Sequence, residues 1–120
     1  MVTKRILFTE PCVAKLVEQE ITPPAVGQAQ VRIAVSTISS GTERANLIGD
    51  VNINSVRPAA AEAKFPRACG YSSAGTIVAV GEGVTEFEPG DRVAVFWSKH
   101  GTYMNVPVKN LLKLPEDVPF

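Results

Sequence analysis

Apolar and polar residues alternate along several short segments of the chain, the pattern of β-strands that bury one face. The clearest case is residues 31–36, where Val31, Ile33 and Val35 are expected on one face of a half-buried antiparallel strand. The same reasoning predicts further strands over residues 6–8, 12–17, 76–80, 92–97, 101–106 and 111–114, the first two forming a hairpin. So many short strands are best hidden in a mainly β fold, a partly open β-barrel with one or two short helices.

Two glycine-containing turns separate the later strands. Glu88-Pro89-Gly90-Asp91 fits a type II turn, because proline fixes φ and glycine supplies a positive φ. Gly81-Glu82-Gly83 resembles the start of a dinucleotide-binding loop, but position 86, where a third glycine would fall, is Glu86. No helical pattern follows, so we interpret these glycines as a hairpin turn and find no cofactor-phosphate site.

A short helix is predicted from near Thr42 to Ile48, ended by Gly49. Ser40 and Glu43 have the spacing of a capping box, in which Ser40 caps the backbone and Glu43 reaches back to it.

The segment after this helix carries little pattern. We interpret residues 50–66 as a surface insertion, in which residues 59–64 could be helical between Pro58 and Pro66. Residues 114–120 look like the lead-in to another element, so we expect residues 1–120 to be one domain of a longer polypeptide.

Charge and cysteine content narrow the class of protein. Lys and Arg number 12, as do Asp and Glu, and this balance argues against nucleic acid or an anionic membrane as a main partner. The sequence has no apolar run of membrane-spanning length and no signal-type N-terminus. Cys12 and Cys69 are too few for a disulfide framework, so we expect both reduced, in a cytoplasmic protein.

The ordered set of motifs resembles one family. Those motifs are Gly27-Gln28 before an alternating strand, Ser40-Gly41-Thr42-Glu43, Gly70 with Gly75, Val80-Gly81-x-Gly83-Val84, Pro89-Gly90-Asp91-Arg92-Val93, Gly101-x-Tyr103 and Leu114-Pro115. Together they resemble the N-terminal, GroES-like catalytic domain of medium-chain dehydrogenases/reductases, the alcohol dehydrogenase superfamily. The resemblance implies a small-molecule substrate and NAD or NADP, held mainly by a Rossmann domain expected after residue 120. It leaves a dimer or tetramer of the full-length protein open.

The resemblance also bears on zinc. Zinc enzymes of this family carry Cys-Gly-Thr-Asp and Gly-His-Glu, whose Cys and His bind the catalytic ion. This chain has Ser40 and Tyr71 there, and a hydroxyl and a phenol are poor zinc ligands near neutral pH. We therefore expect no metal ligands in this chain; the family's third ligand would lie beyond residue 120.

Zinc-independent hydride transfer needs another group at the substrate oxygen. Tyr71 is the best candidate as hydrogen-bond donor or acid, and Thr42 matches a family position whose hydroxyl contacts that oxygen. Ser40 is a further hydroxyl, and Arg44 is a weaker candidate for a cofactor phosphate. Each has a structural alternative: a helix cap for Ser40, a first-turn residue for Thr42, an amphipathic rim residue for Tyr71 and a solvated cation for Arg44.

Three aromatic or imidazole side chains have simpler interpretations. His100, the single histidine, precedes Gly101 and is expected at the surface or rim. Phe96 and Trp97 are expected in the core or at a domain interface.

The resemblance, together with the substituted zinc positions, therefore implies the catalytic domain of a zinc-independent NAD(P)-dependent oxidoreductase. We expect it to act on an alcohol, carbonyl or enone-type substrate and to be inactive as a fragment. Two alternatives stay open. One is a non-enzymatic GroES-like or co-chaperonin-type barrel. The other is a zinc-dependent alcohol dehydrogenase with substituted ligands.

Overall fold

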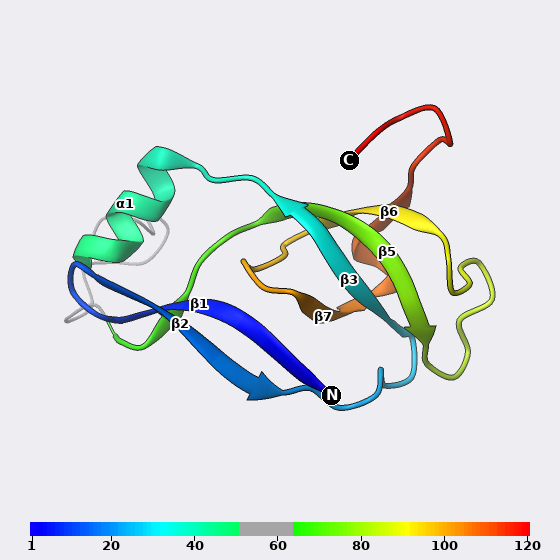
Figure 1. Ribbon diagram of the computed structural model, residues 1–120, viewed down its shortest axis with the longest axis horizontal. Helices are drawn as coiled ribbons and strands as arrows, with labels where there is room; N and C mark the ends of the chain where they lie inside the picture. Colours follow the sequence, from blue (N-terminus) through cyan, green and yellow to red (C-terminus); the bar gives the residue numbers. More distant parts are fainter. Residues whose placement is uncertain (51–63) are drawn as a thin grey trace.

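The computed structural model describes residues 1–50 and 64–120 (Figure 1). The strands are β1 (Val2–Glu10), β2 (Val13–Glu20), β3 (Gln28–Ser36), β4 (Arg67–Ala68), β5 (Ser72–Val80), β6 (Arg92–Phe96), β7 (Tyr103–Pro107) and β8 (Leu111–Lys113). The helices are α1 (Ser40–Ile48) and a short 3-10 helix, η2 (Val108–Asn110). The mainly β prediction is confirmed, whereas the possible helix over residues 59–64 lies outside the described residues except for Lys64. No helix in the described part of the chain is long and apolar enough to cross a membrane.

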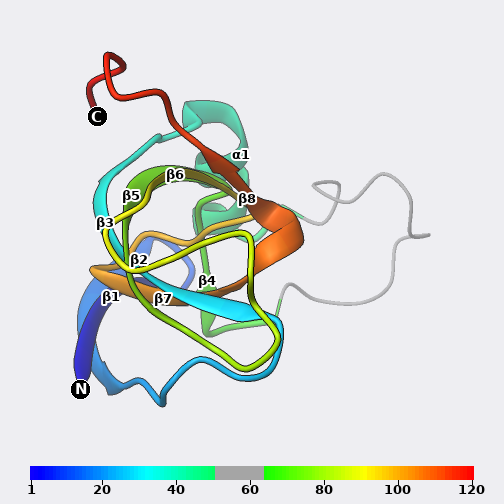
Figure 2. The same cartoon turned by 90° about the vertical axis from the view of Figure 1, so that its right-hand side faces the viewer.

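The strands form two antiparallel sheets, one in the order β2-β1-β4 and one in the order β7-β3-β5-β6-β8. Figure 2 shows the strands curving around a common interior, as expected for a partly open barrel. Backbone hydrogen bonds join the sheets, from Ile6 N–H to the His100 carbonyl at 3.1 Å and from Thr102 N–H to the Lys4 carbonyl at 2.9 Å. The segment before β7 therefore holds the two sheets together.

The core lies inside the five-stranded sheet. Its buried members are Ala29, Val31, Ile77, Val93, Val95, Val106 and Leu111, supplied by β3, β5, β6, β7 and β8. Burial of each large aliphatic side chain is worth about 1.5–3 kcal/mol, so this cluster is the main source of stability in the described residues.

The alternation predicted for β3 holds only in its first half. Val31 is fully buried and Ile33 packs against the core, but Val35 is 47% exposed, so its predicted burial is wrong. The reason is an irregularity in the register: Ile33 pairs with Gly75 and Val35 with Ala74, which leaves Ala34 without a partner on β5. An extra residue of this kind reverses the facing of every side chain that follows it.

Both turn predictions are confirmed. Gly90 has φ of +101°, and the Asp91 N–H donates to the Glu88 carbonyl at 3.1 Å. Gly83 has φ of +81° in the connection between β5 and β6, and no helix follows it. The glycines of residues 81–83 are therefore turn residues, as predicted.

The predicted C-terminal end of the helix is confirmed, whereas the predicted N-cap residue is wrong. Gly49 ends α1 in the left-handed conformation, with φ of +75°. The N-cap is Ser39, whose side chain makes no capping bond, so Ser40 is the first helical residue and not the cap. Glu43 still reaches back, but its Oε1 accepts the Ser39 N–H at 3.2 Å, four positions earlier.

Candidate functional site

Three segments that are distant in sequence meet beside α1. They are residues 36–43, which lead from β3 into α1, residues 69–72, which lead into β5, and residues 97–101, which precede β7. The first two are joined by the Thr37 N–H, which donates to the Ser72 carbonyl at 3.0 Å.

Backbone hydrogen bonds also join the second segment to the third. The His100 N–H donates to the Cys69 carbonyl at 3.0 Å, and the Ser98 N–H donates to the Tyr71 carbonyl at 3.2 Å. Gly70 lies between them with φ of +102°, and a Cβ there would meet the His100 nitrogen at 3.0 Å. Glycine therefore permits the close approach of these two segments.

His100 is the centre of a buried polar cluster. Its side chain is only 7% exposed, and Nε2 lies 2.9 Å from both carboxylate oxygens of Glu43. Nδ1 lies 2.7 Å from the hydroxyl of Ser36. Because a carboxylate only accepts hydrogen bonds, Nε2 donates to Glu43. The prediction of a surface or rim role for His100 is therefore wrong.

Cys69 lies against this pair. The residue is 2% exposed, and burial, together with the negative charge of Glu43, raises the pKa of the Cys69 thiol to about 11. The thiol sulfur, a Glu43 carboxylate oxygen and a His100 ring nitrogen all lie within 4.8 Å of one another. We call Glu43, Cys69 and His100 the Glu–Cys–His cluster.

Sequence reasoning missed the Glu–Cys–His cluster. The sequence indicates helix capping for Glu43 and gives no reason to combine Cys69 with His100. The sequence offers one local signal, which is that Cys69 and His100 each immediately precede a glycine, Gly70 or Gly101. Nothing in the spacing of the three residues predicts that they meet.

The predicted catalytic residues lie on two of the three converging segments. Ser40 and Thr42 are exposed on the first turn of α1, and Tyr71 is 41% exposed just before β5. No hydrogen bond connects these three side chains within the described residues. Arg44, the candidate for a cofactor phosphate, is also exposed on α1.

Exposed apolar side chains also occur on the segments that adjoin residues 71–72 through backbone pairing. Phe96 at the end of β6 is 51% exposed, Trp97 is 77% exposed and Ile38 is 73% exposed. Phe96 pairs with Ser72, the neighbour of Tyr71, so these side chains belong to adjacent strand ends. The prediction of a core position for Phe96 and Trp97 is wrong, and their role at a domain interface stays a prediction. A group of exposed aromatic residues is typical of a surface that contacts a ligand or a partner.

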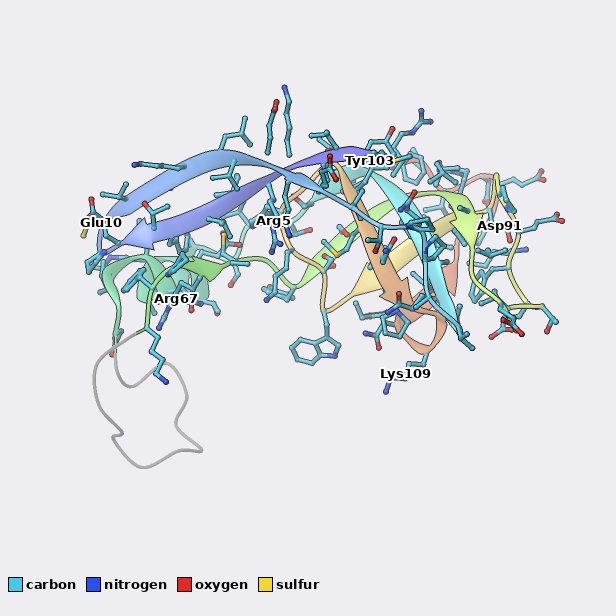
Figure 3. The ribbon with its side chains drawn as sticks, turned by 90° about the horizontal axis from the view of Figure 1, so that it is seen from below. Arg5, Glu10, Arg67, Asp91, Tyr103 and Lys109 are labelled. Carbon is cyan, nitrogen blue, oxygen red and sulfur yellow. The ribbon has the colours of Figure 1, made fainter. Side chains whose placement is uncertain are left out.

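A cleft of about 360 Å³ lies between the β1–β2 hairpin and β7, and Lys99, His100 and Gly101 of the third converging segment also line it. Arg5 of β1 and Tyr103 of β7 both line it (Figure 3). The Arg5 guanidinium donates to Oε1 of Gln19 at 2.9 Å. The volume of the cleft suits a small molecule, but Ser40, Thr42 and Tyr71 are not among the residues that line the cleft.

The family's zinc positions do not fit a metal in this chain. Ser40 and Tyr71 offer a hydroxyl and a phenol, both exposed, whereas zinc in proteins is bound by thiolate, neutral imidazole or carboxylate groups. No step of the reaction is therefore assigned to an ion at these two positions.

Comparison with known proteins identifies the family. Residues 27–116 match the alcohol dehydrogenase GroES-like domain. The starvation-sensing protein RspB of Escherichia coli K12 is 36% identical over 92 residues, which cover 77% of this chain and 24% of that protein. The crystal structure of human synaptic vesicle membrane protein VAT-1 homolog-like protein has a TM-score of 0.82 at 22% identity, over 100% of this chain and 38% of that one. A short chain alcohol dehydrogenase, RspB, of Escherichia coli CFT073, complexed with NADH, has a TM-score of 0.74 at 25% identity, over 98% of this chain and 40% of that one.

The chain belongs to the alcohol dehydrogenase GroES-like domain family, and through it to the medium-chain dehydrogenases/reductases, a superfamily of oxidoreductases. It spans about a quarter of the length of its curated relative RspB. The two zinc-ligand positions of the family are substituted here by Ser40 and Tyr71.

Proposed function

We propose that this chain is the catalytic domain of an NAD(P)-dependent oxidoreductase that transfers hydride between a nicotinamide and an alcohol, carbonyl or enone-type small molecule. We further propose that the substrate oxygen is stabilised by hydroxyl groups and not by a catalytic zinc ion. The observation that carries the proposal is the pair Ser40 and Tyr71 at the family's zinc-ligand positions, both exposed beside the convergence of three chain segments. The NADH bound to the similar RspB supports the choice of cofactor.

The residues have distinct proposed roles. Hydride transfer to a carbonyl or enone carbon leaves negative charge on the substrate oxygen, and Tyr71 donates a hydrogen bond or a proton to that oxygen. Thr42 contacts the same oxygen or relays its proton, and Ser40 adds a further hydroxyl. Arg44, exposed on α1, is proposed to contact a cofactor phosphate, and the cofactor itself is proposed to be bound mainly by a domain after residue 120.

The proposal extends to the location and the oligomeric state of the enzyme. Both cysteines are free in the structure, and we propose that the protein is located in the cytoplasm. We further propose that the full-length protein forms a homo-dimer or tetramer and has no nucleic acid or membrane partner. Size-exclusion chromatography separates this from a co-chaperonin-type barrel, for which a heptamer would be expected.

Substitution of Tyr71 tests the mechanism. In the full-length enzyme, Tyr71→Phe removes only the phenol oxygen, and we expect kcat/KM to fall by about 10²–10⁴-fold. Tyr103→Phe is the matched comparison, because Tyr103 lies on β7 outside the converging segments and lines the cleft between the β1–β2 hairpin and β7. If the substrate binds at Tyr71 and not in that cleft, Tyr103→Phe should leave kcat/KM unchanged. An unchanged rate in Tyr71→Phe would remove Tyr71 from the mechanism.

Metal removal tests zinc independence. Enzyme stripped of metal by a chelator should keep its kcat at temperatures where it stays folded. A loss of kcat that added Zn²⁺ restores would show that the substituted positions do not preclude zinc catalysis, and would favour the zinc-dependent alternative.

A further inference from the structure

We propose that the Glu–Cys–His cluster of Glu43, Cys69 and His100 binds a divalent transition-metal ion, of which Zn²⁺ suits the donors best. The site is separate from Ser40 and Tyr71 and has no role in the hydride transfer proposed above. The inference therefore stands whether or not that function is correct.

The donor set is the first argument. A thiol, an imidazole and a carboxylate are the three side-chain types that bind zinc in proteins. Tetrahedral zinc with bonds of about 2.0–2.3 Å separates its ligand atoms by roughly 3.3–3.8 Å. The three donor atoms already lie within 4.8 Å of one another, with His100 Nε2 at 2.9 Å from Glu43. Shifts of about 1 Å or less would form the site.

The outer partners of the donors are the second argument. A metal-bound histidine commonly uses its other ring nitrogen to bind a neighbouring group, which fixes the ring orientation. Here Ser36 Oγ lies 2.7 Å from Nδ1, which leaves Nε2 as the ligand atom. The carboxylate of Glu43 is also held from behind, because its Oε1 accepts the Ser39 N–H at 3.2 Å. Both donors are therefore oriented before any ion arrives.

Burial and backbone constraint are the third argument. Cys69 is 2% exposed and His100 is 5% exposed, and the hydrogen bond between His100 N–H and the Cys69 carbonyl at 3.0 Å fixes the two residues relative to each other. A site assembled by the fold loses little conformational freedom when it binds an ion.

Charge balance is the fourth argument. An ion at the site would displace the proton of the Cys69 thiol, and the proton on Nε2 of His100 would move to Nδ1, where Ser36 Oγ can accept a hydrogen bond from it. The thiolate and the carboxylate of Glu43 would then neutralise the two positive charges of Zn²⁺, so the buried site would carry no net charge.

The ion would connect parts of the chain that secondary structure alone does not. Glu43 comes from the first turn of α1, Cys69 from the segment before β5 and His100 from the segment before β7. Bound metal would therefore stabilise the folded protein, and three protein donors would leave a fourth position for water or another ligand.

Cobalt titration tests the site. Metal-stripped full-length protein is titrated with Co²⁺, which reports a thiolate ligand through a near-ultraviolet charge-transfer band. We expect one equivalent to bind with this band and Zn²⁺ to displace it. Cys69→Ser should abolish the band, and Glu43→Gln and His100→Gln should each weaken binding at least 10-fold. Zn²⁺ should raise the Tm of the wild-type protein more than that of any of these three variants. Cys12→Ser is the control, because Cys12 is exposed outside the cluster, and should leave binding unchanged.

Two results would overturn the proposal. One is a folded wild-type protein that shows no charge-transfer band at millimolar Co²⁺. The other is a band that persists in Cys69→Ser. Should the substituted proteins fail to fold, zinc X-ray absorption of the wild-type protein decides the question: one sulfur among the ligands supports the site, and a shell without sulfur refutes it.

Discussion

Glu43 and His100 are 57 residues apart in sequence, yet Nε2 of His100 lies 2.9 Å from both carboxylate oxygens of Glu43. The two side chains are 12% and 7% exposed. This contact joins the first turn of α1 to the segment that precedes β7. It therefore holds the helix that carries Ser40 and Thr42 against the barrel.

Removing one member of this pair should be costly. We expect His100→Ala to lower the free energy of unfolding by about 3 kcal/mol or more, because it leaves the Glu43 carboxylate buried without its partner. Urea denaturation of the purified protein measures the change. A double-mutant cycle with Glu43→Gln should show that the two effects are not additive.

The exposed pair of Lys4 and Glu18 is the control for this experiment. Its charged atoms are 3.7 Å apart, but the side chains are 55% and 66% exposed, so Glu18→Gln should cost less than about 1 kcal/mol. A similar cost for His100→Ala would show that the Glu43–His100 contact contributes little to stability.

Local backbone chemistry explains what the sequence predicted well. Gly90 and Gly83 have φ of +101° and +81°, conformations that glycine adopts without strain, so their turns were recognisable from residue type alone. Val35 shows the limit of such reasoning. Its exposure follows from the unpaired Ala34, a property of the pairing between β3 and β5 that the alternating pattern does not record.

The candidate site was predictable only in part. Ser40, Thr42 and Tyr71 came from matching motifs to a family, and motifs are local in sequence. The Glu–Cys–His cluster depends on three long-range backbone approaches, and neither periodicity nor spacing encodes them. Trp97 illustrates the same limit: residue type favours burial, but the side chain is 77% exposed.

The close contact between β3 and β5 at Gly75 should not tolerate a side chain. A Cβ there would lie 2.2 Å from the Arg32 carbonyl oxygen, so β3 would have to shift. We expect Gly75→Ala to lower the free energy of unfolding by about 3 kcal/mol. Thermal and urea denaturation measure the change.

Gly41 is the matched control for Gly75. It lies in the first turn of α1, has no positive φ, and a Cβ there would meet no atom within 4 Å. Gly41→Ala should therefore stabilise the protein by about 0.5–1 kcal/mol through helix propensity. Equal effects of the two substitutions would contradict the packing described for β3 and β5.

Asp91 should make stability dependent on pH in the acid range. Its carboxylate accepts the Glu88 N–H at 3.0 Å and lies 2.9 Å from the Lys113 ammonium, and these contacts lower the pKa of Asp91 below its ordinary value of 3.8. The stabilisation by the Asp91 carboxylate is therefore fully present at pH values above 3.8, the ordinary pKa. It is lost as the pH falls through the lower pKa of the folded state. Because Lys113 is 55% exposed, we expect Asp91→Asn to cost no more than about 1 kcal/mol at neutral pH.

Acid titration of stability tests this prediction. The difference in the free energy of unfolding between wild type and Asp91→Asn should be constant at pH values above 3.8 and disappear at lower pH. Asp117→Asn, at an exposed position near the end of the chain, should show no such difference. A difference that persists in strong acid would mean that the charge of Asp91 is not its cause.

Ser98 should be replaceable by alanine without loss of stability. It is 1% exposed, and its hydroxyl has no hydrogen-bond partner among the described residues, so burial of that hydroxyl is a cost. Its backbone N–H donates to the Tyr71 carbonyl at 3.2 Å, and Ser98→Ala preserves that bond. We expect the free energy of unfolding to stay the same or rise by up to about 1 kcal/mol.

Ser36→Ala is the contrasting case, because it removes the hydroxyl 2.7 Å from Nδ1 of His100 and should lower the free energy of unfolding by about 1–2 kcal/mol. A comparable loss in Ser98→Ala would show that the Ser98 hydroxyl does have a partner in the folded protein, and that the segment before His100 is held by side chains as well as by its backbone.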